Sequence, residues 1–192
     1  MTKEKIIKKI ILILLFFPCI ALAQTNKEIA TDHLNKLKNG VLLVRLKTSE
    51  NKVNALKKAG RDKEAEEIIK KQYLENQKIY AAFKTAYHFS PGYFFYSSSS
   101  NEILRENYKG SLLNEKLEVD SVLNVTASNI YISEFDNTQG TGFFALVIKN
   151  QKYELLVKPF PFYVKGFDFL PVFRKPIVDM VYILNGKLNK AI

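Results

Sequence analysis

Cysteine is nearly absent from this chain. The single cysteine of the 192 residues is Cys19, which lies in an N-terminal segment that we expect to be removed. The remaining chain then has no thiol, so it forms no disulfide, no cysteine metal site and no cysteine nucleophile. An exported domain without disulfides depends on the packing of its core for stability. Thiol redox chemistry and cysteine-based catalysis are therefore excluded.

Histidine is also scarce, and the common catalytic motifs are missing. His33 and His88 are the only histidines, and neither has a metal-ligating partner at the usual spacing. A zinc site would need both histidines together with carboxylates that the fold brings close. No G-x-S-x-G motif is present, and the serines at 97–100 lie one strand's length from His88. We predict no catalytic residue, no metal site and no cofactor.

Patterns that bind phosphates or nucleic acids are lacking as well. Gly140-Thr141-Gly142 precedes an expected strand rather than a helix, and no lysine follows at the spacing of a phosphate-binding loop. The lysines are dispersed and no arginine-rich cluster is present, so we expect no nucleic-acid partner. Glu134 and Asp136 are interpreted as solvated acids, with Glu134 the best single candidate for an acid, but one carboxylate does not make a glycosidase pair.

The first 23 residues have the pattern of a secretory signal peptide. A lysine-rich start precedes an apolar run over residues 10–20, and Ala21-Leu22-Ala23 supplies small residues for cleavage between Ala23 and Gln24. The run is shorter than the roughly 20 residues that span a bilayer, which argues against the alternative of a retained anchor. Lipidation of Cys19 is not expected, because Pro18 precedes it. We predict a periplasmic or secreted domain, residues 24–192, that is not an integral membrane protein.

The mature chain is basic. Loss of the four lysines and one glutamate of the signal peptide lowers the formal net charge from +10 to +7. Such a charge favours anionic surroundings and solubility. Two interpretations remain: a generally lysine-rich surface, or a surface that meets an anionic component of the envelope.

Hydrophobic periodicity and turn signals predict an alternation of helices and strands. The helix at 61–87 would be about 39 Å long, which exceeds the width of a compact domain, so we expect part of it to project or break. The segments 110–128 and 136–142 are expected to be irregular. Helices are predicted over residues 26–38, 48–59, 61–87, 101–108 and from 176, strands over 41–47, 93–98 and 129–135, and a hairpin over 143–158 with its turn at 149–152.

This order predicts an α/β fold. Strands joined by helices pair in parallel through right-handed crossovers, and a late hairpin adds antiparallel strands. We expect a mixed, mostly parallel sheet flanked by helices. The element order is similar to that of thioredoxin-like proteins, which is an analogy of fold only, since the redox cysteine pair is absent.

The segment KPFPFYVKGFDFLP, residues 158–171, is rich in proline and aromatic residues. Prolines exclude it from a helix and from a central strand, so we expect an extended segment beside the hairpin. Two interpretations of its aromatic residues remain. They either cover one end of the sheet as core, or form a docking surface whose members are Phe162, Tyr163, Phe167, Asp168 and Arg174.

The same segment carries a resemblance. Together with GFFALVI and NGVLLVRLK, the run KPFPFYVKGFDFLP resembles a group of uncharacterised exported proteins of Gram-negative bacteria. The resemblance covers most of the mature chain and implies a shared fold and export. It implies no reaction, no ligand and no catalytic residue.

The sequence thus predicts a non-enzymatic binding domain of the bacterial envelope. Its partner would be a protein or an anionic envelope component, reached through a surface rather than through a catalytic constellation. The alternative is an envelope hydrolase or transferase that uses dispersed carboxylates. A concave pocket with convergent titratable groups would favour the enzyme, and an exposed aromatic face would favour the binding domain.

Overall fold

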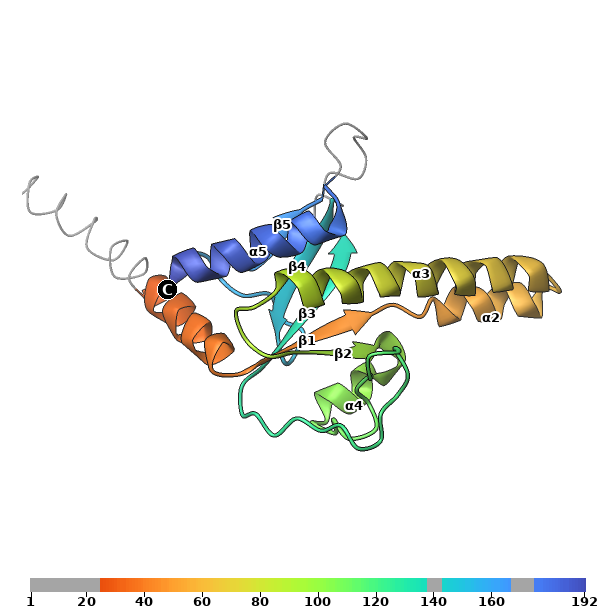
Figure 1. Cartoon of the computed structure of the whole chain (residues 1–192), viewed down its shortest axis with the longest axis horizontal. Helices are drawn as coiled ribbons and strands as arrows, with labels where there is room; N and C mark the ends of the chain where they lie inside the picture. The colour runs from red at the N-terminus through yellow and green to blue at the C-terminus, as the bar shows by residue number, and fades with distance from the viewer. Residues whose placement is uncertain (1–24, 138–142, 167–174) are drawn as a thin grey trace, which may run out of the picture.

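A five-stranded mixed sheet forms the centre of the computed structural model, which describes residues 25–137, 143–166 and 175–192 (Figure 1). The strand order is β2-β1-β3-β4-β5. β2, β1 and β3 are parallel, whereas β4 is antiparallel to both β3 and β5. The predicted α/β class, with a mixed sheet and late antiparallel pairing, is confirmed. The strands are β1 (Val41–Leu46), β2 (Gly92–Tyr96), β3 (Ile130–Asn137), β4 (Phe144–Asn150) and β5 (Tyr163–Lys165).

The helices follow the predicted order. The structure describes the N-terminal helix over residues 25–38. One short 3-10 turn, Ser97–Ser99, links β2 to α4, and α4 ends earlier than the pattern predicted. The other helices are α2 (Glu50–Lys58), α3 (Asp62–Ala86), α4 (Ser100–Leu104) and α5 (Ile177–Ala191).

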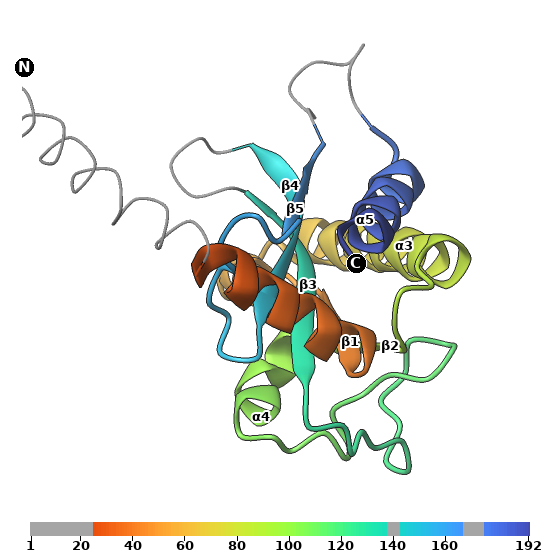
Figure 2. The same cartoon turned by 90° about the vertical axis from the view of Figure 1, so that its left-hand side faces the viewer.

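The larger core lies between one face of the sheet and three helices. The N-terminal helix, α3 and α5 all pack on this face, as Figure 2 shows. Alternate residues of β1, Leu42 and Val44, point into it and are fully buried. Their spacing follows the period of two of a strand, which sends successive side chains to opposite faces. This core also holds Phe160, so the interpretation of that aromatic as core is confirmed.

A smaller core covers part of the opposite face. Leu43 of β1 and Ile132 of β3 are fully buried there against α4 and the segment 105–127. That segment is largely irregular, as predicted, and is tied down by isolated bridges such as Phe95 with Leu112. The smaller core does not reach the carboxyl ends of β1 and β3. Polar residues occupy this face of the sheet there.

The expected hairpin over residues 143–158 is wrong in its second half. β4 pairs with β3 on one side and with β5 on the other. Residues 153–158 contribute only one bridge, between Leu155 and Lys149. The chain instead turns at residues 151–153 and passes through Pro159 and Pro161 before it pairs. Because neither proline can donate to a ladder, the pairing strand starts after them, at Tyr163.

The proline-rich segment is therefore partly a strand, which the sequence did not predict. β5 lies at the edge of the sheet, the position that tolerates nearby proline. The preceding residues 158–162 form a turn and an extended link. The prediction of a loop at 136–142 is wrong for its first two residues, since Asp136 and Asn137 complete β3. Residues 138–142 and 167–174 lie outside the described residues.

The long helix is unbroken. α3 has 25 residues, and its N-terminal half extends beyond the sheet with α2 alongside it (Figure 1). Val53 is the buried residue of α2, and Ala65 is buried near the start of α3. The prediction that part of this helix projects is confirmed. None of the helices in the described parts of the chain combines the length and apolar character that crossing a bilayer requires.

Candidate functional site

The chain paths diverge at the carboxyl ends of β1 and β3. These strands are parallel neighbours, but the chain leaves β1 toward β2 and leaves β3 toward β4. In open α/β sheets, ligands bind outside the carboxyl ends of the strands at such a divergence. Polar residues occupy this place on the face that the smaller core leaves uncovered.

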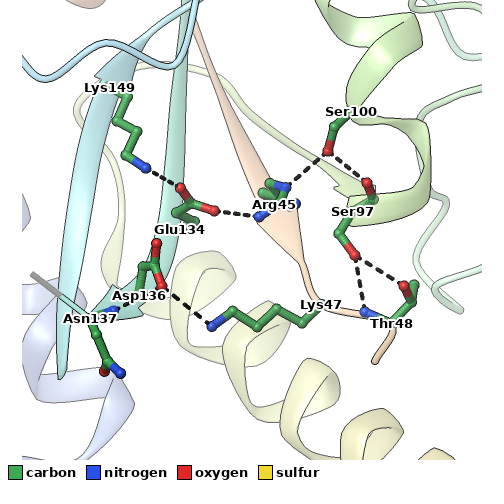
Figure 3. Close-up of polar contacts among 9 residues, drawn as sticks. All are labelled: Arg45, Lys47, Thr48, Ser97, Ser100, Glu134, Asp136, Asn137 and Lys149. Carbon is green, nitrogen blue, oxygen red and sulfur yellow. Dashed lines mark hydrogen bonds and ion pairs between the residues drawn. The ribbon is translucent and has the colours of Figure 1, made fainter. Parts of the chain in front are cut away.

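A buried carboxylate stands at this divergence. Glu134 of β3 is only 3% exposed, and each of its oxygens meets a cation. Arg45 of β1 lies directly opposite in register, and its Nη1 donates to Oε2 at 2.6 Å. Lys149 of β4 donates its Nζ to Oε1 at 2.5 Å (Figure 3). The three strands thus supply a cation, an anion and a cation, with a formal charge of +1.

Hydroxyl groups extend this cluster toward α4. The Arg45 Nε donates to Ser100 Oγ at 2.9 Å, and Ser100 Oγ donates to the carbonyl of Ser97 at 2.7 Å. Ser97 Oγ in turn contacts the backbone N and the Oγ1 of Thr48, as Figure 3 shows. The serines that follow β2 are therefore structural partners of Arg45. This network holds the guanidinium in one orientation, because both sides of the group are bonded.

A tight turn after β4 places an aromatic ring beside Arg45. The Asn150 Oδ1 accepts from the backbone N of Lys152 and of Glu154, and Tyr153 adopts a left-handed conformation with φ of 62°. The Arg45 guanidinium lies 6.0 Å from the centre of the Tyr153 ring, within cation–π range. Burial raises the pKa of Tyr153, and the nearby Ser100 hydroxyl and the Arg45 charge oppose that shift. The Tyr153 hydroxyl is buried and forms no hydrogen bond of normal geometry with the described residues.

A cleft of about 640 Å³ opens next to this cluster. Its floor comes from β3 and β4, and its walls come from β5 and from the chain between β4 and β5. Register places Val147 opposite Tyr163 and Ala145 opposite Lys165, so these side chains share the face that carries Glu134. The volume falls in the range of small-molecule sites. The lining residues are Asp136, Asn137, Val147, Lys149, Tyr153, Glu154, Leu155, Lys158, Phe162, Tyr163 and Lys165.

The outer edge of β5 is closed to a further strand. Lys187 of α5 donates its Nζ to the carbonyl of Tyr163 at 3.1 Å, and Lys175 donates to the carbonyl of Lys165 at 3.2 Å. Lysines at a sheet edge are a common device against pairing with another chain. A ligand of this region is therefore directed to the face of the sheet, where the cleft lies, rather than to its edge.

Two of the predicted surface residues reach the cleft. Phe162 and Tyr163 both line it, with ring centres 5.0 Å apart, and both are partly buried. The other predicted residues of this surface, Phe167, Asp168 and Arg174, lie outside the described residues. The predicted cleavage residues Ala23 and Gln24 lie outside them as well.

The histidines have separate structural partners. His33 Nδ1 lies 2.8 Å from the Tyr131 hydroxyl, and burial, the largest influence, lowers the pKa of His33. Burial also raises the pKa of Tyr131 to about 12. His88 lies in the loop after α3, where its Nε2 is 3.1 Å from the carbonyl of Thr85. Within the ranges that the structure describes, no group of three or more metal-ligating side chains comes together.

The interpretation of Glu134 as a solvated acid is wrong. Asp136 is half-exposed and pairs with Lys47 at 3.8 Å, but Glu134 is buried. Sequence reasoning also missed Arg45 and Lys149. A signal was present, because Arg45 and Lys149 are the single charges of β1 and β4, and Glu134 lies among apolar residues of β3. A buried charge needs a partner that neutralises it. These charges would therefore have indicated a contact among the three strands.

Comparisons with known proteins leave this α/β protein without a family. No family model matches the chain, and no curated protein or solved structure is significantly similar to it. The resemblance to exported proteins of Gram-negative bacteria remains a prediction from the sequence. The cleft and the charged cluster beside it are therefore the features that indicate a function.

Proposed function

We propose that this protein is an exported binding domain of the bacterial envelope, and that its ligand occupies the cleft over β3, β4 and β5. The observation that carries the proposal is the position of this cleft. It lies at the carboxyl end of β3, beside the charged cluster that joins β3 to β1 and β4, and is lined by Phe162 and Tyr163. Aromatic side chains beside a few polar groups are the usual lining of a binding site.

The charged cluster supports binding rather than acid–base catalysis. Both oxygens of Glu134 are already paired with cations, so the carboxylate directs no free oxygen at a ligand. A general base must come within hydrogen-bond reach of the proton that it removes. The cluster instead fixes the spacing of three strands at the end of the cleft. The cleft is concave and lined by titratable groups, which is the feature expected of an enzyme. However, Glu134 is held between two cations and Asp136 pairs with Lys47, so two of the nearby acids are engaged in ion pairs. We therefore favour a rigid binding site over the alternative of a hydrolase or transferase.

Site-directed photo-cross-linking tests the proposal. A photoreactive phenylalanine analogue at Tyr163 places the reactive group in the cleft, and the same analogue at Tyr182 serves as the control, because Tyr182 lies on α5 and is 72% exposed. We expect irradiation of cells to give a specific adduct from position 163 and none from position 182. Equal labelling at the two positions, or none at 163, would rule out the cleft as the binding site.

Export is tested separately. We propose that the leader is removed between Ala23 and Gln24, on the pattern of the first 23 residues. Mass spectrometry of the protein recovered from the cell envelope should give a chain that begins at Gln24. A different N-terminus, a lipid adduct on Cys19, or recovery from the cytoplasm alone would contradict this part of the proposal.

A further inference from the structure

We propose that the cleft binds a small amphipathic anion, meaning an apolar chain or ring that carries one acidic group. This inference rests on the proposed function, because it names the class of ligand for the same site. Three properties of the cleft support it: uncompensated lysines, an apolar wall and a closed strand edge.

The lysines of the cleft outnumber the acids that could neutralise them. Lys149 is paired with Glu134, and Asp136 is paired with Lys47. Lys158 and Lys165 also line the cleft, and neither forms a salt bridge with any residue that the structure describes. The remaining acid of the lining, Glu154, accepts a hydrogen bond from the neutral amide of Asn150 at 2.7 Å and keeps its charge, so three lysines and two acids give the lining a formal charge of +1. An anionic group would find complementary charge at the two lysines.

The cleft also has an apolar wall. Val147, Leu155, Phe162 and Tyr163 line the cleft, and Leu155 is 47% exposed although it is a large aliphatic residue. Burial of apolar surface is favourable in proportion to the area that is removed from water. A ligand with an apolar body would cover this wall, whereas a small inorganic anion would leave it in water. A purely ionic ligand therefore fits the cleft less well than an amphipathic one.

The lysine-capped edge of β5 argues against a peptide that pairs with the sheet. Strand addition needs free backbone groups along an edge. Here the carbonyls of Tyr163 and Lys165 already accept from lysine side chains. The cleft volume of about 640 Å³ also suits a compact molecule.

Fluorescence titration of the purified protein with 1-anilinonaphthalene-8-sulfonate, an aromatic anion, tests the inference. We expect saturable binding of one probe per chain. Four competitors with the same alkyl chain are then compared below their micellar concentrations: dodecanoate, dodecyl phosphate, dodecyl maltoside and dodecyltrimethylammonium. Dodecanoate or dodecyl phosphate should displace the probe with an inhibition constant about tenfold lower than the neutral and cationic competitors. The stronger of the two anions then identifies the acidic group as a carboxylate or a phosphate.

Variants matched in charge separate the cleft from the basic surface. The double variant K158Q/K165Q removes two positive charges from the cleft and should weaken probe binding about tenfold. The control K27Q/K190Q removes the same charge from exposed positions on the N-terminal helix and α5. It should leave binding unchanged. Near-ultraviolet circular dichroism of both variants confirms that their tertiary structure is intact.

The outcomes distinguish this inference from the proposed function. If all four competitors displace the probe equally, the preference for an anion is overturned and the cleft remains a binding site. If K27Q/K190Q weakens binding as much as K158Q/K165Q, general surface charge explains the binding and the inference fails. If no probe binds and position 163 gives no cross-link, the proposed function falls as well.

Discussion

Arg45 and Glu134 face each other across two parallel strands, with the guanidinium Nη1 2.6 Å from the carboxylate Oε2. A cross-strand pair of this kind sets the register of the two strands, because a shift of one residue would send every side chain to the other face. Lys149 completes the arrangement from the antiparallel neighbour. The three residues together thus join the parallel half of the sheet to the antiparallel half at the point where the cleft begins.

Removal of the central anion should destabilise the fold. Glu134→Gln keeps the shape of the side chain but leaves Arg45 and Lys149 without their counter-charge. Breaking a buried pair costs about 3–5 kcal/mol, and we expect about 3 kcal/mol, because both cations keep some contact with water. Urea unfolding measures the loss. Glu64→Gln, which breaks an exposed pair with Arg61, is the control and should leave stability essentially unchanged.

Lys149→Met should cost less than Glu134→Gln. Methionine retains most of the aliphatic stem, and Glu134 keeps its bond to Arg45. We expect a loss of about 1–2 kcal/mol, in line with the loss of one charge-assisted hydrogen bond. A larger loss for Lys149→Met than for Glu134→Gln would mean that Lys149, rather than the carboxylate, organises the cluster.

The sequence predicted β1 and β3 better than it predicted the chain after β4. Runs such as VLLVRL and IYISEF, with helices between them, sufficed to place β1 and β3 in a parallel sheet. The end of β4 was not predictable in the same way. Residues 153–157 have the apolar character of a strand, but the turn at Tyr153 and the prolines that follow delay pairing until Tyr163. Tertiary contacts decided the outcome there, as they commonly do for β propensity.

The candidate site was less predictable than the fold. Phe162 and Tyr163 attracted notice through composition, whereas Glu134 lies 89 positions after Arg45, and Lys149 lies 15 positions after Glu134. Their meeting depends on the register of three strands, which local patterns do not specify. A lone charge within an apolar strand indicates that a partner exists, but only the topology shows which partner it is.

Tyr153 and Tyr87 should respond in opposite ways to loss of the hydroxyl. The Tyr153 hydroxyl is buried and forms no hydrogen bond with the described residues, so Tyr153→Phe should leave stability unchanged or raise it by up to about 1 kcal/mol. The Tyr87 hydroxyl lies 2.8 Å from Ser90 Oγ, and Tyr87→Phe should cost about 1 kcal/mol. Chemical denaturation of the two variants gives the comparison. A clear loss for Tyr153→Phe would show that its hydroxyl has a partner, such as a bound ligand or water.

Mutation of Phe160, in the aromatic segment before β5, should show that this residue belongs to the core. Phe160 is 2% exposed within the larger core, and its ring lies 6.3 Å from that of His33. Phe160→Ala should therefore cost about 3–5 kcal/mol. Tyr182→Ala provides an exposed aromatic control and should cost less than about 0.5 kcal/mol. Similar unfolding midpoints for the two variants would contradict the placement of Phe160 in the core.

His33 should make stability depend on pH. Burial lowers the native pKa of His33, with a smaller opposing effect of Asp32, so the unfolded state binds more protons between the native pKa and the ordinary histidine pKa of 6.5. The free energy of unfolding therefore rises with pH in that window and falls as the pH drops below 6.5. His33→Gln removes this contribution. We expect a smaller loss of stability between about pH 7.5 and pH 5.5 in the variant. Equal losses in the variant and the parent protein would show that other groups govern this range.

Two glycines should respond oppositely to alanine. Gly186 lies inside α5, and a Cβ there would meet nothing within 4 Å. Gly186→Ala should raise stability by about 0.5–1 kcal/mol, because glycine is the poorer helix former. Gly40 precedes β1, where a Cβ would overlap the carbonyl oxygen of Asn129 and lie 2.6 Å from that of Lys36. Since both are backbone atoms, Gly40→Ala should force the N-terminal helix away from β3 and cost about 3 kcal/mol. Thermal unfolding should show a higher midpoint for Gly186→Ala and a lower one for Gly40→Ala, and a tolerated alanine at position 40 would refute this close approach of helix and strand.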